Sequence, residues 1–152
     1  MPETNEPKSW LDKEICFPMY ACTKEIIKLY TPYLDKIGLT YTQYITMMVL
    51  WEKKQARVKD LGEILYLNSA TLTPVLKKLE SKGLITRNRM KSDERNVLVQ
   101  VTPDGENLER KAASISRSVM KKLDLEENES KVLYILSRKI LAKLSEKNGL
   151  LD

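Results

Sequence analysis

Apolar residues recur every three or four positions along most of this chain, which is the spacing that gives a helix one buried face. The first such stretch covers about Leu11–Tyr30, and Pro18 falls near its start, where a helix tolerates proline. Thr40 and Gln43 have the form of a capping box and open a second helix that continues through Trp51. The same spacing predicts a third helix over Arg57–Leu65 and a fourth from a cap at Asn68 or Ser69 to a stop at Gly83. It also predicts one long helix from Thr102 through Leu123 and a last helix from Asp124 through Leu144.

The apolar period changes from that of a helix to that of a strand after Gly83. Leu84–Arg89 and Arg95–Thr102 both alternate in this way, and the polar segment Met90–Glu94 forms the tip of a hairpin between them. Two helices joined by a turn and followed by such a hairpin form a winged helix-turn-helix. We therefore expect a mainly α fold with a small β-wing, in which further helices flank the winged-helix core.

Domain organisation follows from the same pattern. Beyond a loose polar tail over residues 1–8, it predicts a single domain over 9–152. The winged-helix core spans about 39–102, and the flanking helices occupy about 9–38 and 103–152. The flanking helices carry apolar stripes that a small core cannot hide, so a second copy of the chain would cover them. The sequence therefore predicts a homodimer held by its N- and C-terminal helices.

Composition narrows the function classes by exclusion. Hydrophobic residues make up 42% and charged residues 31% of the chain, a balance typical of soluble globular proteins. The longest apolar run, Met47–Trp51, is too short to cross a bilayer, and we see no N-terminal signal pattern, so we expect a cytoplasmic protein with no membrane partner. The chain has no histidine, which removes His-based metal sites and the Ser–His and Cys–His forms of catalysis; no metal or cofactor is expected.

Positive charge is concentrated in one part of the chain. Between Asn68 and Val101, seven basic residues stand against three acidic ones, while the whole chain carries a net charge of +5. A basic cluster of this kind is the electrostatic signature of a site for a polyanion. Charge alone fits a merely solvated surface equally well.

Several spaced segments, in the order of the predicted elements, resemble one known family. They are Ile15–Ala21 (ICFPMYA), Leu39–Tyr44 (LTYTQY), Leu67–Pro74 (LNSATLTP), Lys82–Ile85 (KGLI) and the wing triplet Asp93–Arg95 (DER). Over essentially its whole length after the tail, the chain is similar to the MarR family of winged-helix regulators and, within it, to the one-cysteine type of organic hydroperoxide resistance regulator. The resemblance implies a dimeric repressor, not an enzyme, which holds a palindromic operator in double-stranded DNA and releases it when its sensor is modified.

The fourth helix and the wing carry the candidate DNA contacts. Small residues let a helix approach base edges closely, and hydroxyls and lysines donate to bases and phosphates. By the resemblance, Arg95 enters the minor groove and Asp93 orients its guanidinium group. A solvated helix face and an ordinary exposed ion pair are the alternatives. The candidate residues are Ser69, Ala70, Thr71, Thr73, Pro74, Lys77 and Lys78 on the helix, with Arg87, Arg89, Lys91, Asp93 and Arg95 on the hairpin.

Ala70 stands where the subgroup often has Gly, which we expect to change the operator sequence more than the mechanism. Pro74 removes one backbone hydrogen bond, so it should bend the helix or delay its start.

Cys16 is the candidate redox sensor. It stands at the start of the first helix, where free amide groups and the helix dipole favour a thiolate, the form that a peroxide oxidises to sulfenic acid. The resemblance assigns Tyr30 and Tyr41 as the hydroxyl partners of this sulfur. Cys16 and Tyr30 are 14 residues apart, about 21 Å along one straight helix, so contact between them must cross between subunits.

The second cysteine is not expected to pair with the first. Cys22 lies about 9 Å further along the helix than Cys16 and points about 240° around it, so we interpret it as core packing. Oxidised Cys16 would then form a mixed disulfide with a small thiol or become overoxidised. The alternatives are that Cys16 is a small buried apolar residue in a regulator that responds to an aromatic ligand, or that it is the nucleophile of a thiol peroxidase.

Overall fold

A winged-helix core forms around the apolar face of the fourth helix. The computed structural model describes residues 9–90 and 93–148. The main elements are α1 (Cys16–Leu34), α2 (Tyr41–Lys53), β1 (Gln55–Arg57), α3 (Val58–Leu65), α4 (Ser69–Ser81), β2 (Ile85–Met90), β3 (Asp93–Val101), α5 (Pro103–Ala112), α6 (Ile115–Leu123) and α7 (Glu127–Asn148), with short 3-10 turns η1 (Leu11–Lys13) and η2 (Asp35–Ile37) before and after α1. The predicted fold class, mainly α with a small β-wing, is confirmed.

Local capping signals fix where the core helices begin. The Thr40 side chain accepts from the amide of Gln43, and the Gln43 side chain accepts from the amide of Thr40, so both bonds of the capping box before α2 are made. Asn68 caps α4 by accepting from the amide of Thr71 at 2.9 Å. Thr102 caps α5 in the same way. These caps satisfy amide groups that the first turn of a helix leaves without partners.

The wing is a three-stranded antiparallel sheet in the order β1-β3-β2. Strands β2 and β3 form the predicted hairpin, in which Ile85 is paired with Val101 and a register shift follows Arg89. Strand β1, which the sequence pattern does not predict, pairs Gln55 with Gln100. It has only three residues, too few to display a period of two.

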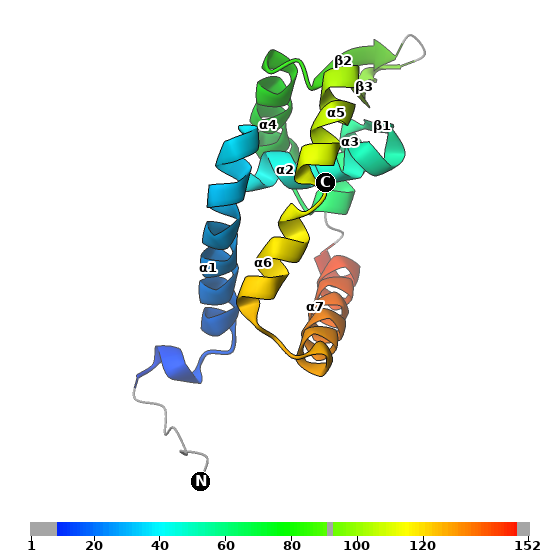
Figure 1. Ribbon diagram of the computed structural model, residues 1–152. Helices are drawn as coiled ribbons and strands as arrows, with labels where there is room; N and C mark the ends of the chain where they lie inside the picture. Colours follow the sequence, from blue (N-terminus) through cyan, green and yellow to red (C-terminus); the bar gives the residue numbers. More distant parts are fainter. Residues whose placement is uncertain (1–8, 91–92, 149–152) are drawn as a thin grey trace.

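The long helix predicted after Thr102 is in fact two helices. Helix α5 ends at Ala112 and α6 begins at Ile115, with Ser114 at φ −97° and ψ −7° between them. Each half packs on a different partner: α5 lies against α2, whereas α6 lies beside α1 (Figure 1). The apolar stripe continues through Ala112, Ile115 and Val119, all buried, so periodicity alone could not reveal the break.

Large parts of the flanking helices are uncovered in the single chain. In Figure 1, α1, α6 and α7 extend to one side of the winged-helix core. The only buried residue of α1 is Leu34, at its last position. Apolar side chains of α7 are largely exposed, including Tyr134 at 66% and Ile135 at 62%. Among residues 9–90 and 93–148, none of the helices combines the length and the apolar character needed to cross a bilayer.

We predict that Gly105→Ala destabilises the fold by about 3 kcal/mol, because a Cβ there would overpack a contact with no free space. That Cβ would lie 2.2 Å from the backbone oxygen of Leu84, which cannot move without shifting the start of the wing. Denaturant unfolding at fixed protein concentration measures the loss. Gly83→Ala is the control, since its Cβ would meet nothing within 4 Å and its positive φ of 72° costs only about 1 kcal/mol. Equal losses for the two variants would contradict this account.

Candidate nucleic-acid interface and sensor cysteine

Helix α4 presents opposite faces to the core and to solvent. Leu72, Leu76 and Leu79 are fully buried against the core, as the sequence predicts. The candidate contact residues lie on the other side, and all of them are exposed except Thr73, which is half-buried: Ser69, Ala70, Thr71, Thr73, Pro74, Lys77 and Lys78. This face is free of large apolar side chains and can lie close to another molecule.

Pro74 does not delay the start of α4. The helix begins at Ser69 and continues through Pro74 to Ser81. A proline at this position supplies no amide for the carbonyl of Ala70. The hydroxyl of Thr73 donates to the carbonyl of Ser69 at 2.7 Å, so another carbonyl of this turn has a side-chain partner. The first turns of α4 thus keep carbonyl and hydroxyl groups directed along its exposed surface.

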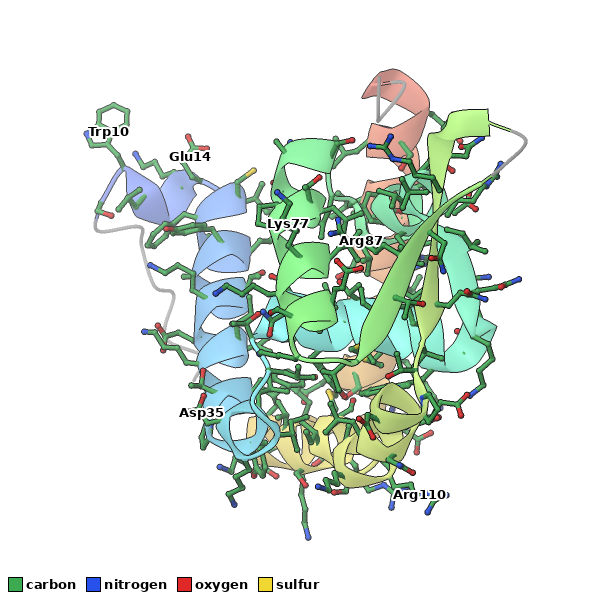
Figure 2. The ribbon with its side chains drawn as sticks, turned by 90° about the horizontal axis from the view of Figure 1, so that it is seen from above. Trp10, Glu14, Asp35, Lys77, Arg87 and Arg110 are labelled. Carbon is green, nitrogen blue, oxygen red and sulfur yellow. The ribbon has the colours of Figure 1, made fainter. Side chains whose placement is uncertain are left out.

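The wing is connected to α4 by an ion pair. Arg87 of β2 donates through Nη2 and Nε to one carboxylate oxygen of Glu80, at 2.6 and 3.0 Å. Figure 2 shows Arg87 between the wing and α4, while Lys77 lies on α4 itself. Hydrogen bonding from Arg87 keeps the pKa of Glu80 below its usual value, so the carboxylate stays ionised at neutral pH. Arg87 therefore has a partner within the chain, which sequence reasoning missed because the two residues are separated by a turn.

A groove of about 530 Å³ separates α3, α4 and the wing. Lys59, Asn68, Thr73 and Arg87 are among the side chains that line it. Of the other wing candidates, Arg89 is exposed on β2. Lys91 lies outside the described residues, as do the side chains of Asp93 and Arg95, whose backbone belongs to β3.

The two candidate sensor tyrosines lie together where α1 meets α2. Tyr30 is in the last turns of α1 and Tyr41 is the first residue of α2. Their ring centroids are 5.0 Å apart in an edge-to-face arrangement. Tyr44 extends this cluster to Trp51, with centroids 6.2 Å apart. Sequence reasoning missed Tyr44, although its position three residues after Tyr41 puts both rings on one helix face.

Cys16 is not part of this cluster within one chain. It is the first residue of α1, and α1 is unbroken from Cys16 to Leu34, so the rise of about 21 Å between Cys16 and Tyr30 applies. The thiol is exposed. The interpretation of Cys22 as core packing is wrong, because Cys22 is exposed as well. The apolar spacing of its helix suggested burial, but within residues 9–90 and 93–148 of the single chain no side chain buries Cys22.

Several exposed apolar residues flank Cys16 in the sequence. Trp10 is 87% exposed and points away from the rest of the chain (Figure 2). Ile15, Phe17 and Met19 are also exposed. Among the described residues, no group of three or more His, Cys, Asp or Glu side chains is arranged to hold a metal ion. The chemistry available here is that of an exposed thiol at the start of a helix.

Comparison with known proteins decides the family. The family model described as "Transcriptional regulator SarA/Rot" matches residues 28–111. The organic hydroperoxide resistance transcriptional regulator of Bacillus subtilis is 47% identical over 110 residues, which cover 72% of this chain and 75% of that protein. The chain belongs to the MarR/SarA family of winged-helix transcriptional regulators. The predicted family is thereby confirmed, and so is the prediction that the chain is not an enzyme.

Further relatives extend over most of this MarR/SarA chain. The regulator SarZ of Staphylococcus aureus is 40% identical over 135 residues, covering 89% of this chain and 91% of SarZ. The structure described as reduced AbfR bound to DNA has a TM-score of 0.73 and 31% identity, with 86% of this chain and 92% of that chain covered. Wild-type MarR from Escherichia coli, at 22% identity and a TM-score of 0.68, shares the fold over 84% of this chain and 97% of its own.

Burial gives the tyrosine cluster a measurable pH dependence. It raises the pKa of Tyr41 above the ordinary 10.0, with a further contribution from Tyr30, and it also raises the pKa of Tyr44. Both hydroxyls therefore remain protonated donors at neutral pH. Since the unfolded chain loses these protons at lower pH than the folded chain, the stability they contribute is present below pH 10.0 and lost as the pH rises above it.

We predict that the double variant Tyr41→Phe/Tyr44→Phe loses stability less steeply than the wild type between about pH 9 and about pH 11, a range that spans tyrosine ionisation. Denaturant midpoints measured across this range provide the test. Tyr66→Phe is the control, since Tyr66 is an exposed tyrosine outside the cluster. An identical decline in the wild type and the double variant would contradict the burial of these hydroxyls.

Proposed function

We propose that this chain is a homodimeric repressor that binds a palindromic operator in double-stranded DNA and releases it when an organic hydroperoxide oxidises Cys16. The relation to the Bacillus subtilis regulator, named for organic hydroperoxide resistance, carries this proposal. Structures described as reduced AbfR bound to DNA, overoxidized AbfR bound to DNA and disulfide-formed AbfR support a link between thiol state and DNA binding. Such a repressor acts in the cytoplasm, where its DNA is.

Helix α4 and the wing form the proposed DNA interface. The exposed face of α4 enters the major groove, with Thr71 and Thr73 near base edges and Lys77 and Lys78 near phosphates. At the wing, Arg89 and Lys91 contact the phosphate backbone of the DNA. Arg95, oriented by Asp93, enters the minor groove. The Glu80–Arg87 ion pair supports this interface by joining the wing to α4.

A second copy of the chain covers the exposed apolar surfaces of α1 and α7. Trp10, Ile15 and Tyr20 near one end of α1 are 87%, 78% and 60% exposed, far more than single scattered apolar residues require. Two-fold symmetry places the two α4 helices so that they meet two half-sites about one helical turn of DNA apart. Residues 39–102 then form the DNA-binding core, and the segments 9–38 and 103–152 form the dimer interface.

The dimer also completes the sensor. In the reduced protein, the partner subunit's Tyr30 and Tyr41 donate hydrogen bonds to the Cys16 thiolate. The thiolate sulfur attacks one oxygen of the hydroperoxide, the O–O bond breaks, and the alkoxide takes a proton and leaves as an alcohol. The sulfur is oxidised to sulfenic acid while the hydroperoxide is reduced by the same two electrons.

A small thiol then converts the sulfenic acid to a mixed disulfide. The sulfur of the thiol bonds to Cys16 and water leaves, so Cys16 becomes bulkier and is no longer an anion. Cys22 does not compete for this step, because it lies about 9 Å further along the same helix. An overoxidised AbfR is described as bound to DNA, which favours the mixed disulfide over overoxidation as the releasing form.

The central test removes the Cys16 thiol in one variant and the hydroxyls of Tyr30 and Tyr41 in another. Cys16→Ser should bind DNA as tightly as the reduced wild type and should not release it with cumene hydroperoxide and free cysteine. In Tyr30→Phe/Tyr41→Phe, sulfenic acid should form about tenfold more slowly, since the anion loses two donors. Mass spectrometry after trapping the sulfenic acid measures the rate, and gel-shift titration on a duplex selected from a random library measures the affinity.

A mixed dimer of the two variants tests whether the sensor crosses between subunits. Its one remaining Cys16 faces intact tyrosines only if these come from the other chain, so it should react at nearly the wild-type rate. A mixed dimer that reacts as slowly as the tyrosine variant would contradict the shared sensor. Peroxide-induced release that persists in Cys16→Ser would contradict the assignment of Cys16 as the sensor. Release by an aromatic acid without peroxide would favour a ligand-responsive regulator, and sustained peroxide turnover with a thiol would favour the peroxidase.

We predict that Arg95→Ala lowers operator affinity about 10- to 100-fold, the range expected for losing a groove contact, while the thermal midpoint stays within a few degrees of wild type. Fluorescence anisotropy on the selected duplex provides the measurement. Arg117→Ala is the matched control, because Arg117 is an exposed arginine on α6, outside α4 and the wing. Since α6 belongs to the proposed dimer segment, size-exclusion chromatography checks that this variant has the same oligomeric state as the wild type. Unchanged affinity in Arg95→Ala would remove the wing from the proposed interface.

A further inference from the structure

Lys82, the residue that follows α4, contacts the segment that joins α1 to α2. Its Nζ donates to the backbone carbonyl of Gly38 and, at 3.0 Å, to Oε1 of Gln43. Gln43 is only 6% exposed, and its Oε1 also accepts from the amide of Thr40 at 3.1 Å. One buried amide oxygen is therefore bonded both to the start of α2 and to the end of α4.

The segment that Lys82 contacts is also where the sensor tyrosines lie. Gly38 is in the left-handed region with φ 68°, which fixes the turn between η2 and α2. Tyr30 is a short distance before this turn and Tyr41 directly follows the cap residue Thr40. Any displacement of Tyr41 moves the first turn of α2 and, with it, the capping box that holds the Lys82 ammonium group.

On its other side, Lys82 belongs to the junction between α4 and the wing. Its own amide bonds to the carbonyl of Lys78, so its backbone continues the last turn of α4. The next residue, Gly83, has φ 72°, and its carbonyl accepts from the hydroxyl of Thr102 at 2.6 Å. A shift of Lys82 is therefore passed to the end of α4 and to the first residues of the wing.

We propose that Lys82 is a positioning residue that couples the oxidation state of Cys16 to the orientation of α4. This inference rests on the proposed function and adds the connection between the sensor and the DNA interface. In the reduced dimer, tyrosine hydroxyls bonded to the partner's sulfur hold the α1–α2 segment in one arrangement. When the modified sulfur displaces Tyr41, the Lys82 ammonium follows Gly38 and Gln43 through its charge-assisted bonds, and the C-terminal end of α4 moves with it.

The competing role for Lys82 is an ordinary phosphate contact, since it belongs to the basic cluster between Asn68 and Val101. The two roles predict different measurements. A phosphate contact contributes equally to DNA binding in every redox state and adds about one to the slope of log affinity against log salt. A coupling residue changes the ratio of affinities between the reduced and oxidised states and leaves the salt slope unchanged.

The experiment uses the full-length protein with Cys22→Ser, so that only Cys16 can be modified. Two states are prepared: the reduced protein, and the mixed disulfide of Cys16 with free cysteine, verified by intact mass. Affinity for the selected duplex is measured in both states at several salt concentrations. In Lys82→Met, we expect reduced-state affinity within about threefold of wild type, an unchanged salt slope, and a loss of affinity on oxidation that is about 3- to 30-fold smaller.

Two further variants make the result specific. Lys77→Met, an exposed lysine on the outer face of α4, should lower affinity equally in both states and reduce the salt slope by about one. Lys82→Arg retains donors that reach both oxygens and should restore the wild-type loss of affinity on oxidation. A general structural defect in Lys82→Met would lower the unfolding midpoint and the reduced-state affinity together, which the arginine comparison and denaturant unfolding reveal.

The inference is overturned if Lys82→Met behaves like Lys77→Met, or if its ratio of reduced to oxidised affinity equals that of the wild type. It is equally overturned if Lys82→Met is folded less stably than Lys82→Arg and loses reduced-state binding. A wild-type mixed disulfide that still binds the duplex at full affinity would contradict the proposed function itself, and the coupling with it. The wild-type measurement therefore separates failure of the function from failure of the coupling.

Discussion

The length of one unbroken helix limits which residues of a single chain can form a sensor together. Helix α1 continues from Cys16 to Leu34 although it contains Pro18 and Pro32. Pro18 is in the first turn, where its missing amide has no helical partner to lose. Pro32 removes the helical bond to the carbonyl of Lys28, but it lies beyond Tyr30, near the end of the helix. Because the helix is unbroken, Cys16 at its start and Tyr30 near its end lie about 21 Å apart along its axis. The proposed sensor contains both groups and therefore requires two chains, so the proposed chemistry depends on the proposed dimer.

Helix α2 is suited to carry a displacement, because its polar side chains are bonded within a well-packed core. Thr46 is fully buried, and its hydroxyl donates to the carbonyl of Thr42 at 2.8 Å. The indole N–H of Trp51 donates to the carbonyl of Gly105 at 2.8 Å. Buried polar groups with satisfied bonds resist independent movement, since breaking one leaves a costly unpaired group. A push at Tyr41 therefore moves α2 as a unit more readily than it deforms the helix.

Features determined by neighbouring residues could be predicted from the sequence, and features determined by distant contacts could not. The caps at Thr40 and Asn68 depend on three or four consecutive residues, so their side chains identify them. The wing could be predicted because the apolar period changes from that of a helix to that of a strand after Gly83. The break between α5 and α6 is not visible, because it arises where two halves of one stripe pack on different helices.

The candidate sites show the same division. Helical geometry alone separates Cys16 from Tyr30, whereas Tyr30 meets Tyr41 only because the chain turns back between them. The exposure of Cys22 is equally a tertiary property, since the same apolar spacing occurs on helices that a neighbour covers and on helices that none covers in the single chain. The bonds from Lys82 to Gly38 and Gln43 join residues about forty positions apart, so no local sequence pattern predicts them.

The connection between α4 and the wing shows how weak contacts can still matter for recognition. The pair formed by Glu80 and Arg87 is partly exposed, at 38% and 26%, so its contribution to stability is small. Its value is geometric: two donors on one carboxylate fix the direction in which Arg87 points. The bond from Thr102 to Gly83 fixes the backbone at the same junction. Helix and wing are thereby oriented together, so in the proposed interface a displacement at the end of α4 would also move the wing relative to the DNA.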